Sequence, residues 1–357
     1  MKNRYLRTAV LYGLGILALA WVVWRNWYPS PDGQSPGLVN ALSKQIHWGS
    51  LLLGAAFFLP GLLLQFIRWY ILVRAQALPF TLYNATRLGL IGFFFNSMLP
   101  GSIGGDLVKA AFIAFEQERR TVAVSTVIID RAIGLWGLIW LVFLSGGAFW
   151  LAGNEAITAE PGLRSILAAV TGIIAGTVAV WLLLGILPQR RADKFAGRLG
   201  RIPKVGHSAA EFWRAIWMYR KKRVSVAAAL ILTIGAHSFF VAAFYFAAQM
   251  FRDSDGPAQI PSFSQHLLFV PICFASEAFI PLPGGIGAGE ALFGWFYSLV
   301  GFPAATGILA SLARRIITWG WSVVGLIVYV QMKPALAKMQ EEIPIDSEPV
   351  AMLDAVK

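Results

Sequence analysis

Long apolar stretches dominate the chain, and six of them are long enough to cross a membrane as single helices. A transmembrane helix needs roughly 20 apolar residues to span about 30 Å of hydrocarbon. Six windows satisfy this requirement, at residues 5–24, 48–73, 121–152, 163–187, 224–250 and 304–331. The pattern therefore predicts an all-α integral membrane protein with six full transmembrane helices.

Two further apolar stretches, residues 84–115 and 263–300, are interrupted at their centres. Leu-Pro-Gly-Ser-Ile-Gly-Gly occupies 99–105 in the first, and Pro-Leu-Pro-Gly-Gly-Ile-Gly-Ala-Gly occupies 281–289 in the second. The halves, of roughly 12–18 residues, are too short for full spans. Irregular backbone is tolerated at membrane depth where protein or a water-filled cavity surrounds it. We therefore expect two re-entrant broken-helix hairpins.

Composition and charge narrow the class of protein and set its orientation. Hydrophobic residues make up 57% of the 357 residues and charged residues 13%, which excludes an ordinary soluble enzyme and a disordered chain. Cytoplasmic loops of membrane proteins are rich in Lys and Arg, so most of the net charge of +12 reflects topology. We expect a protein of the cell (inner) membrane with both termini cytoplasmic.

The loop 188–223 carries eleven of the basic residues and is expected to be cytoplasmic. Within it, Phe212, Ile216 and Tyr219 recur at helical spacing, so this segment is a candidate for contact with anionic lipid. The alternative is that the loop serves only as an orientation signal. We expect no nucleic-acid partner. The basic residues are Arg190, Arg191, Lys194, Arg198, Arg201, Lys204, Arg214, Arg220, Lys221, Lys222 and Arg223.

In the first window, an apolar run follows Lys2, Arg4 and Arg7 and contains Ala18-Leu19-Ala20, as a secretory signal would. Its apolar run continues to Trp24, which is longer than the roughly 7–15 residues of a signal core. We therefore expect an uncleaved anchor helix.

An internal repeat relates the two broken stretches. At an offset of 183 positions, Pro-Gly-x-Ile-Gly at 100–104 matches the same pattern at 283–287. The same offset takes Arg131 to Arg314, and a Trp-Gly pair follows each of these arginines five residues later. Two separated matches in one register indicate a duplication.

Each half of the duplication has the order span, broken hairpin, span. We assign repeat A to residues 48–152 and repeat B to 224–331, within one polytopic domain of residues 1–331 followed by a cytoplasmic tail, 332–357. Under the expected topology the two hairpins enter from opposite sides. Inverted-topology repeats with broken helices are typical of transporters. The alternative is a duplicated fold retained for packing alone.

Four charged residues are expected near the middle of the membrane. Asp130 and Arg131 lie roughly 14 Å into a helix that begins near residue 121, and Arg314 and Arg315 lie about 15 Å into one that begins near 304. An ionised side chain at this depth costs roughly 2.5 to 3.5 kcal/mol. Each should therefore face protein or a wet cavity and have a partner.

Acidic partners lie beside the broken turns. Asp106 follows the first glycine cluster, Glu290 follows the second, and Glu277 precedes the second. Asp106 and Glu290 also suit the first turn of a helix, where a carboxylate accepts hydrogen bonds from N–H groups. The two roles are compatible. Lys109, one turn after Asp106, is expected to neutralise it.

Arg131 and Arg314 are the leading candidates for binding a phosphate, because a guanidinium donates forked hydrogen bonds to it. The alternative is a purely structural ion pair. The half-helices that follow Gly105 and Gly289 would add N–H donors. The remaining candidate binding residues are Asn96 and Ser102, as neutral donors, and the turn residues Pro100, Gly101, Gly104, Pro283, Gly284, Gly285 and Gly287.

Catalytic motifs and metal-ligand spacings are absent from the sequence. The four histidines, His47, His207, His237 and His266, have no ligand spacing, and Cys273 is the single cysteine. We expect no metal and no cofactor.

Four motifs together resemble those of the bacterial and archaeal family of flippase-like membrane proteins related to the transmembrane region of lysylphosphatidylglycerol synthase. They are Asn-x-x-Leu-Pro-Gly-x-Ile-Gly-Gly-Asp at 96–106, Asp-Arg at 130–131 with Gly134, Pro-x-Pro-Gly-Gly-Ile-Gly-x-Gly-Glu at 281–290, and Arg314 or Arg315. The resemblance covers residues 49–331. It implies an α-helical membrane domain with re-entrant helices that moves a phospholipid or a polyprenyl-linked lipid between leaflets.

The full synthase carries a cytosolic aminoacyl-transferase domain after its membrane region, whereas about 26 residues follow residue 331 here. We therefore do not expect lysyl transfer. The leading hypothesis is a flippase- or scramblase-like transporter of an anionic phospholipid or a polyprenyl-phosphate-linked lipid. One alternative is a membrane-embedded transferase with Asp106 or Glu290 as base. Another is a scaffold whose loop 188–223 recruits a separate lipid-modifying enzyme.

Overall fold

The structure, a computed structural model, describes residues 2–30, 35–43, 45–99, 104–154, 160–202, 206–253 and 260–341. These residues are largely helical and contain no β-strand. The longer helices are α1 (Lys2–Arg25), α3 (Trp48–Ala75), α6 (Arg120–Leu151), α8 (Pro161–Ile186), α11 (Arg223–Gln249) and α14 (Ala304–Glu341). The shorter ones are α2 (Gly37–Leu42), α4 (Leu82–Met98), α5 (Gly104–Glu116), α9 (Gln189–Leu199), α10 (Gly206–Tyr219), α12 (Phe263–Glu277), the 3₁₀ turn η1 (Pro283–Gly285) and α13 (Ala288–Leu299).

Six helices of the described chain are long and apolar enough to cross a membrane, namely α1, α3, α6, α8, α11 and α14. The prediction of an all-α, multi-pass membrane protein is confirmed. The helix boundaries lie close to those expected from hydropathy. The exception is α14, which continues to Glu341 and so passes the position, 332, at which we expected the tail to begin.

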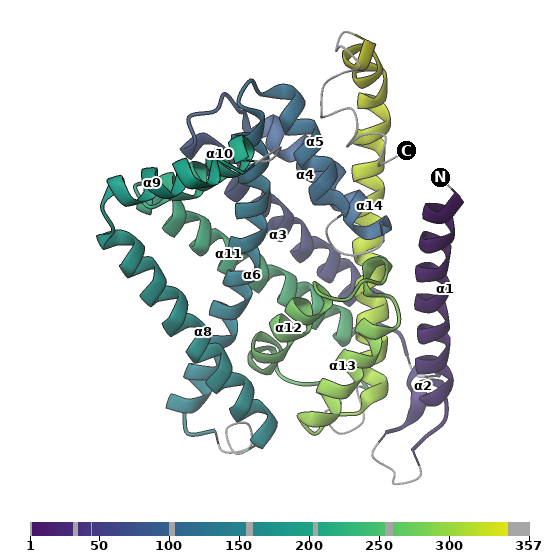
Figure 1. Cartoon of the computed structure of the whole chain (residues 1–357). Helices are drawn as coiled ribbons and strands as arrows, with labels where there is room; N and C mark the ends of the chain where they lie inside the picture. The colour runs from purple at the N-terminus through teal and green to yellow at the C-terminus, as the bar shows by residue number, and fades with distance from the viewer. Residues whose placement is uncertain are drawn as a thin grey trace.

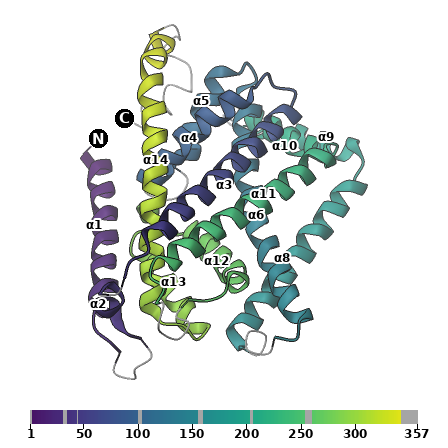
Figure 2. The same cartoon turned by 180° about the vertical axis from the view of Figure 1, so that it is seen from behind.

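The two interrupted stretches form two pairs of short helices. α4 has 17 residues and α5 has 13. α12 has 15 residues and α13 has 12. Figures 1 and 2 show α4 and α5 in the half of the molecule that holds α9 and α10, whereas α12 and α13 lie toward the opposite end.

Local chemistry explains where these short helices begin. The Thr81 hydroxyl accepts from the backbone N–H of Asn84 at 3.1 Å and starts α4, and Ser262 forms a capping box with Gln265 at the start of α12. α13 follows Gly287, whose φ of +82° is readily adopted only by glycine.

Glycines allow the first helices of the two halves, α3 and α11, to pack closely (Figure 2). A Cβ placed on Gly61 would lie 2.6 Å from the ring of Phe240, and one on Gly54 would lie 3.0 Å from the carbonyl oxygen of Ala243. Small residues at helix contacts are typical of membrane proteins, where close packing replaces the hydrophobic driving force. This contact fixes the two halves beside each other.

α1 stands at the edge of the molecule and touches both interrupted stretches (Figure 1). The Tyr12 hydroxyl donates to the carbonyl oxygen of Met98, the last residue of α4. Ala18 and Leu19 pack so closely on Gly287 that a Cβ there would lie 2.6 Å from each. α1 therefore lies against the end of α4 and against the second turn.

The basic loop 188–223 folds into α9 and α10. The ring of Trp213 lies 4.7 Å from that of Phe195 and 5.7 Å from that of Trp217. The Tyr219 hydroxyl donates to the carbonyl oxygen of Leu72 at 2.8 Å, and burial raises the pKa of Tyr219. Trp217 and Tyr219 are buried against protein, whereas Ile216 is exposed. Only part of the apolar face of α10 is therefore open to lipid.

Candidate functional site

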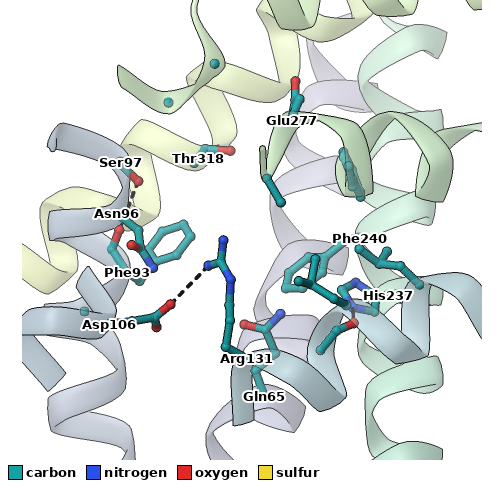
Figure 3. A pocket seen from close by; sticks show the side chains of 18 of the residues that line it. Gln65, Phe93, Asn96, Ser97, Asp106, Arg131, His237, Phe240, Glu277 and Thr318 are labelled. Atoms are coloured by element: carbon teal, nitrogen blue, oxygen red, sulfur yellow. Dashed lines mark hydrogen bonds and ion pairs between the residues drawn. The ribbon is translucent and has the colours of Figure 1, made fainter. Parts of the chain in front are cut away.

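A cavity of about 350 Å³ lies where the two halves of the chain meet. Its walls come from α3, α4, α5 and α6 on one side and from α11, α12, η1 and α14 on the other. Figure 3 shows Arg131 projecting into it, between Asp106 on one side and His237 with Phe240 on the other. The charged lining residues that the structure describes are Arg68, Lys109, Arg131, Arg314, Arg315, Asp106, Asp130 and Glu277.

Asp130 is the centre of a buried ion cluster on the side of repeat A. Its carboxylate accepts from Arg68 Nε at 2.7 Å and from Lys109 Nζ at 3.3 Å. Arg68 also donates to the Thr233 hydroxyl at 3.2 Å, and Lys109 lies 4.2 Å from the centre of the Trp69 ring. One carboxylate thus holds two cations, all three with side chains at most 11% exposed.

The expectation that Lys109 neutralises Asp106 is met only through space, because Lys109 acts on the charge of Asp106 but forms its direct ion pair with another carboxylate. Lys109 Nζ reaches Asp130 on α6, and Asp106 Oδ2 accepts from Arg131 Nη1 at 3.1 Å. The physical reason is that α5 packs against α6, so both side chains of α5 form direct ion pairs with opposite charges on that neighbour.

Two ion pairs, one from each half, are open to the cavity. The side chains of Arg131 and Asp106 are 29% and 17% exposed. Arg314 Nη2 lies 2.8 Å from Glu277 Oε1, and these side chains are 15% and 13% exposed. The Nε of Arg314 is buried and has no hydrogen-bond acceptor among the described residues.

Arg315 and Glu290 form a closed pair behind them. Arg315 donates to the two carboxylate oxygens of Glu290 at 2.6 and 3.1 Å and to the carbonyl oxygen of Gly284 at 2.7 Å. Glu290 also accepts from the Ser311 hydroxyl at 3.2 Å and from the Gly287 N–H at 2.7 Å. It combines the ion-pair and helix-start roles. This pair joins the second turn to α14.

The glycine turns hold their own backbone donors. The Gly105 N–H donates to Asn96 Oδ1 at 2.8 Å, and the Gly287 N–H donates to Glu290. These two N–H groups are therefore not available to an anion. A Cβ on Gly104 would lie 2.5 Å from that of Leu99, so small residues are needed here.

Gly284 and Gly285 have φ values of +54° and +68°, and Pro283 is buried. The turn is thus a fixed piece of irregular backbone. Gly284, Gly285, Asn96 and Glu277 all line the cavity. The candidates Pro100, Gly101 and Ser102 lie outside the described residues.

Four further residues that were not predicted from the sequence as site residues also line the cavity, namely Arg68, Gln65, His237 and Thr318. Arg68 and His237 each interrupt an apolar window, so the cost of a polar group in the membrane was a signal that pointed to them. The described residues contain no group of three His, Cys, Asp or Glu side chains placed to hold a metal ion.

A second cavity, of about 240 Å³, lies between the end of α8 and the helices α9 and α10. Its walls are apolar apart from Arg191, and they include Leu187, Phe195, Trp213 and Trp217. The Trp217 indole N–H donates to Gln189 and that of Trp213 to the carbonyl oxygen of Ala192, so both rings are held in place.

Comparison with known proteins gives one match. The family model described as the lysylphosphatidylglycerol synthase TM region matches residues 8–326. No curated protein and no solved structure matches the chain.

Proposed function

Because the chain belongs to the family of the lysylphosphatidylglycerol synthase TM region, we propose that it is a flippase- or scramblase-like transporter of lipids. The cargo is an anionic phospholipid or a polyprenyl-phosphate-linked lipid. The observation that carries this proposal is the cavity between the halves, into which Arg131 and Arg314 project from opposite sides. Pairs of arginines suit a phosphate, because each guanidinium can donate two parallel hydrogen bonds.

The charges of the cavity favour an anion. On the side of repeat A, Arg68, Lys109 and Arg131 face two carboxylates, those of Asp106 and Asp130. On the side of repeat B, Arg314 and Arg315 face Glu277 and Glu290. The described cluster thus carries one excess positive charge. A phosphodiester would balance it.

The short helices act in this proposal as two re-entrant hairpins of inverted topology. α4 and α5 enter from the side of α9 and α10, and α12 and α13 enter from the other side (Figure 1). Rocking of one half against the other would open the cavity to each side in turn, as in other transporters built from inverted repeats. The termini are cytoplasmic in this arrangement, and the protein resides in the inner membrane.

Translocation is tested in liposomes that contain the protein and phosphatidylglycerol with a fluorescent acyl chain. A membrane-impermeant reductant bleaches only the outer-leaflet label in protein-free vesicles. We expect bleaching to proceed nearly to completion when the protein is present. Bleaching that stops at the outer-leaflet fraction for this lipid and for a polyprenyl-phosphate lipid would contradict the proposed function.

The inverted topology predicts opposite accessibility for two exposed positions. Glu118 follows α5 and Ser298 lies near the end of α13, and both are exposed. In a Cys273→Ser background, a membrane-impermeant thiol reagent should label Ser298→Cys in intact spheroplasts and should label Glu118→Cys only after permeabilisation. Labelling of both from the same side would exclude inverted repeats. Buried Cys273 should give no signal in the parent protein.

We also propose that the second cavity lies against anionic headgroups of the cytoplasmic leaflet. Arg191 stands in an apolar pocket on a basic helix pair, which suits a headgroup above an acyl chain. Brominated phosphatidylglycerol should therefore quench tryptophan fluorescence more than brominated phosphatidylcholine does. The difference should shrink in a Trp213→Phe/Trp217→Phe variant and in Arg191→Gln. Equal quenching by both lipids in the parent protein would refute this contact.

A further inference from the structure

The carboxylate of Glu277 is held much less firmly than that of Glu290 behind it. Among the described residues, the side chain of Glu277 accepts one hydrogen bond, through Oε1 from Arg314 Nη2 at 2.8 Å. The side chain of Glu290 accepts four, two of them from Arg315. Each hydrogen bond to a charged group adds to the cost of moving it. Glu277 is therefore the carboxylate that can be displaced more easily.

The surroundings of Arg314 place Glu277 in competition with any anion that this arginine binds. The centres of the Phe274 and Phe293 rings lie 5.3 and 5.4 Å from Arg314 Cζ. A guanidinium forms forked hydrogen bonds along an edge, through Nη1 with Nη2 or through Nε with Nη2. Both arrangements use Nη2, which is the atom that Glu277 holds. A phosphate that makes a forked contact with Arg314 therefore competes with Glu277.

A second guanidinium, that of Arg315, lies beside the carboxylate of Glu277. A guanidinium has five N–H donors, and three hydrogen bonds join Arg315 to described residues. A Cβ on Gly289 would overlap Glu277 Oε1 and would lie 3.4 Å from Arg315 Nη2, so the two groups border the same small space. A Cβ on Gly285 would lie 3.7 Å from Glu277 Cγ. The carboxylate thus rests in a glycine-lined slot that leads to Arg315.

The internal repeat explains why this slot exists in repeat B. The offset of 183 residues places Gly289 at the position of Asp106. In repeat A the acid stands on the helix that follows the turn, whereas in repeat B this position is glycine and Glu277 enters the space from the helix before the turn. Figure 3 shows Glu277 across the cavity from Asp106. Glutamate has one more rotatable bond than aspartate, so the carboxylate of repeat B has the longer reach.

We propose that Glu277 is a displaceable counter-ion, which pairs with Arg314 until a phosphate group binds there and then moves to Arg315. This inference rests on the proposed function and describes the regulation of the same site. The move leaves the charge of the ion cluster unchanged, because Glu277 stays ionised and passes from one guanidinium to the other. The returning carboxylate later competes with the phosphate and speeds its release. Glu277 is thus a positioning residue, which acts through Arg314.

Removal of the carboxylate tests the competition in detergent solution, with fluorescent phosphatidylglycerol as the probe. We expect Glu277→Gln to bind this lipid about tenfold more tightly than the parent does, because the lipid no longer displaces a charge-assisted hydrogen bond. Asp106→Asn is the matched control, since it removes the same charge from the pair of the more exposed Arg131 and should tighten binding only about twofold. The same series with soluble glycerol phosphate distinguishes a free phosphate from a lipid-borne one.

Gly289→Ala tests the position of the carboxylate without changing its charge. The added methyl group would overlap Glu277 Oε1, which is the end of a flexible side chain, so the carboxylate must leave its place on Arg314. Binding of phosphatidylglycerol should again tighten several-fold. Gly172→Ala, where a Cβ would have no neighbour within 4 Å, should leave binding unchanged.

Translocation in proteoliposomes adds a readout that a purely structural role would not produce. Glu277→Gln should bind the lipid more tightly and yet translocate it several-fold more slowly, because no carboxylate returns to release it. Unchanged or weaker binding in folded Glu277→Gln would overturn the inference. If Glu277→Gln does not fold, unchanged binding in Gly289→Ala would overturn it.

Two further outcomes separate the competition from general electrostatics and from the proposed function. Equal tightening in Glu277→Gln and Asp106→Asn, with no effect of Gly289→Ala, would overturn the inference, because charge alone would then explain the gain. Tighter binding by Glu277→Gln and Gly289→Ala in a protein whose parent translocates no lipid would contradict the proposed function and leave the displaceable counter-ion in place.

Discussion

The Arg131→Ala/Arg314→Ala double variant is expected to lose lipid translocation by at least about a hundredfold while it remains folded. A hydrogen bond to a charged group contributes about 1.5–3 kcal/mol, so two arginines together account for a factor of this size. The substitutions leave Asp106 and Glu277 without their arginines, so some loss of stability is expected as well and folding must be measured together with the rate. The rate of fluorescent phosphatidylglycerol translocation in proteoliposomes measures the effect.

Two comparison variants and a check of folding make this experiment specific. Arg87→Ala removes an arginine that pairs with Glu116 at 2.9 Å, outside the cavity, and should leave the rate near that of the parent. Arg131→Lys/Arg314→Lys keeps the charge without the forked donor geometry and should give an intermediate rate. Size-exclusion profiles and thermal unfolding establish folding. If the folded double alanine variant translocates lipid at the full rate, Arg131 and Arg314 do not bind the lipid.

Asp130→Ala should destabilise the protein by about 3–5 kcal/mol, the cost typical of a buried charge that loses its partner. The substitution strands two cations, Arg68 and Lys109, whose side chains are 5% and 11% exposed. A lower midpoint of thermal unfolding in detergent is the measurement. Further replacement of Lys109 by Met should recover part of the loss, because one stranded charge is then removed.

Glu116→Ala is the matched control for Asp130→Ala. It also breaks an ion pair, but its partner Arg87 is 26% exposed and can turn toward water. The expected loss is about 0–1 kcal/mol. If the two variants unfold at the same temperature, Asp130 does not hold a buried cluster together.

Hydropathy predicted the helices well because a membrane imposes length and polarity on each segment separately. α6 and α11 begin and end within one residue of the windows 121–152 and 224–250. The Pro/Gly clusters also located the breaks between α4 and α5 and between α12 and α13. Helix length, polarity and the positions of proline and glycine are local properties of the chain, so they can be read from a single sequence.

The side-chain partners were less predictable because they depend on how neighbouring helices are rotated. The spacing of Lys109 and Asp106 on one helix suggested an ion pair between them. Packing of α5 against α6 instead gives Lys109 a direct ion pair with Asp130 and Asp106 one with Arg131. The repeat offset favoured Arg314 over Arg315, but it did not reveal their partners. The structure shows that both line the cavity, with Arg315 held by Glu290 and Arg314 by Glu277.

Arg68 was missed for a different physical reason. It lies five residues from the end of its apolar window, and long basic side chains in that position usually reach the membrane surface. Its contact with Asp130 depends on the tertiary arrangement of α3 and α6. Membrane depth alone therefore does not separate a surface arginine from a buried one.

The uneven charges of the ion cluster have a consequence for bioenergetics. With ordinary ionisation, the five basic and four acidic side chains give the ion cluster around the empty cavity a charge of plus one, and a bound phosphodiester would bring it to zero. Moving one elementary charge across the membrane potential changes the free energy by about 2.3 kcal/mol per 100 mV. In the proposed transport cycle, voltage would therefore act on the return of the empty carrier and leave the loaded step unaffected, so the cycle would be electrogenic.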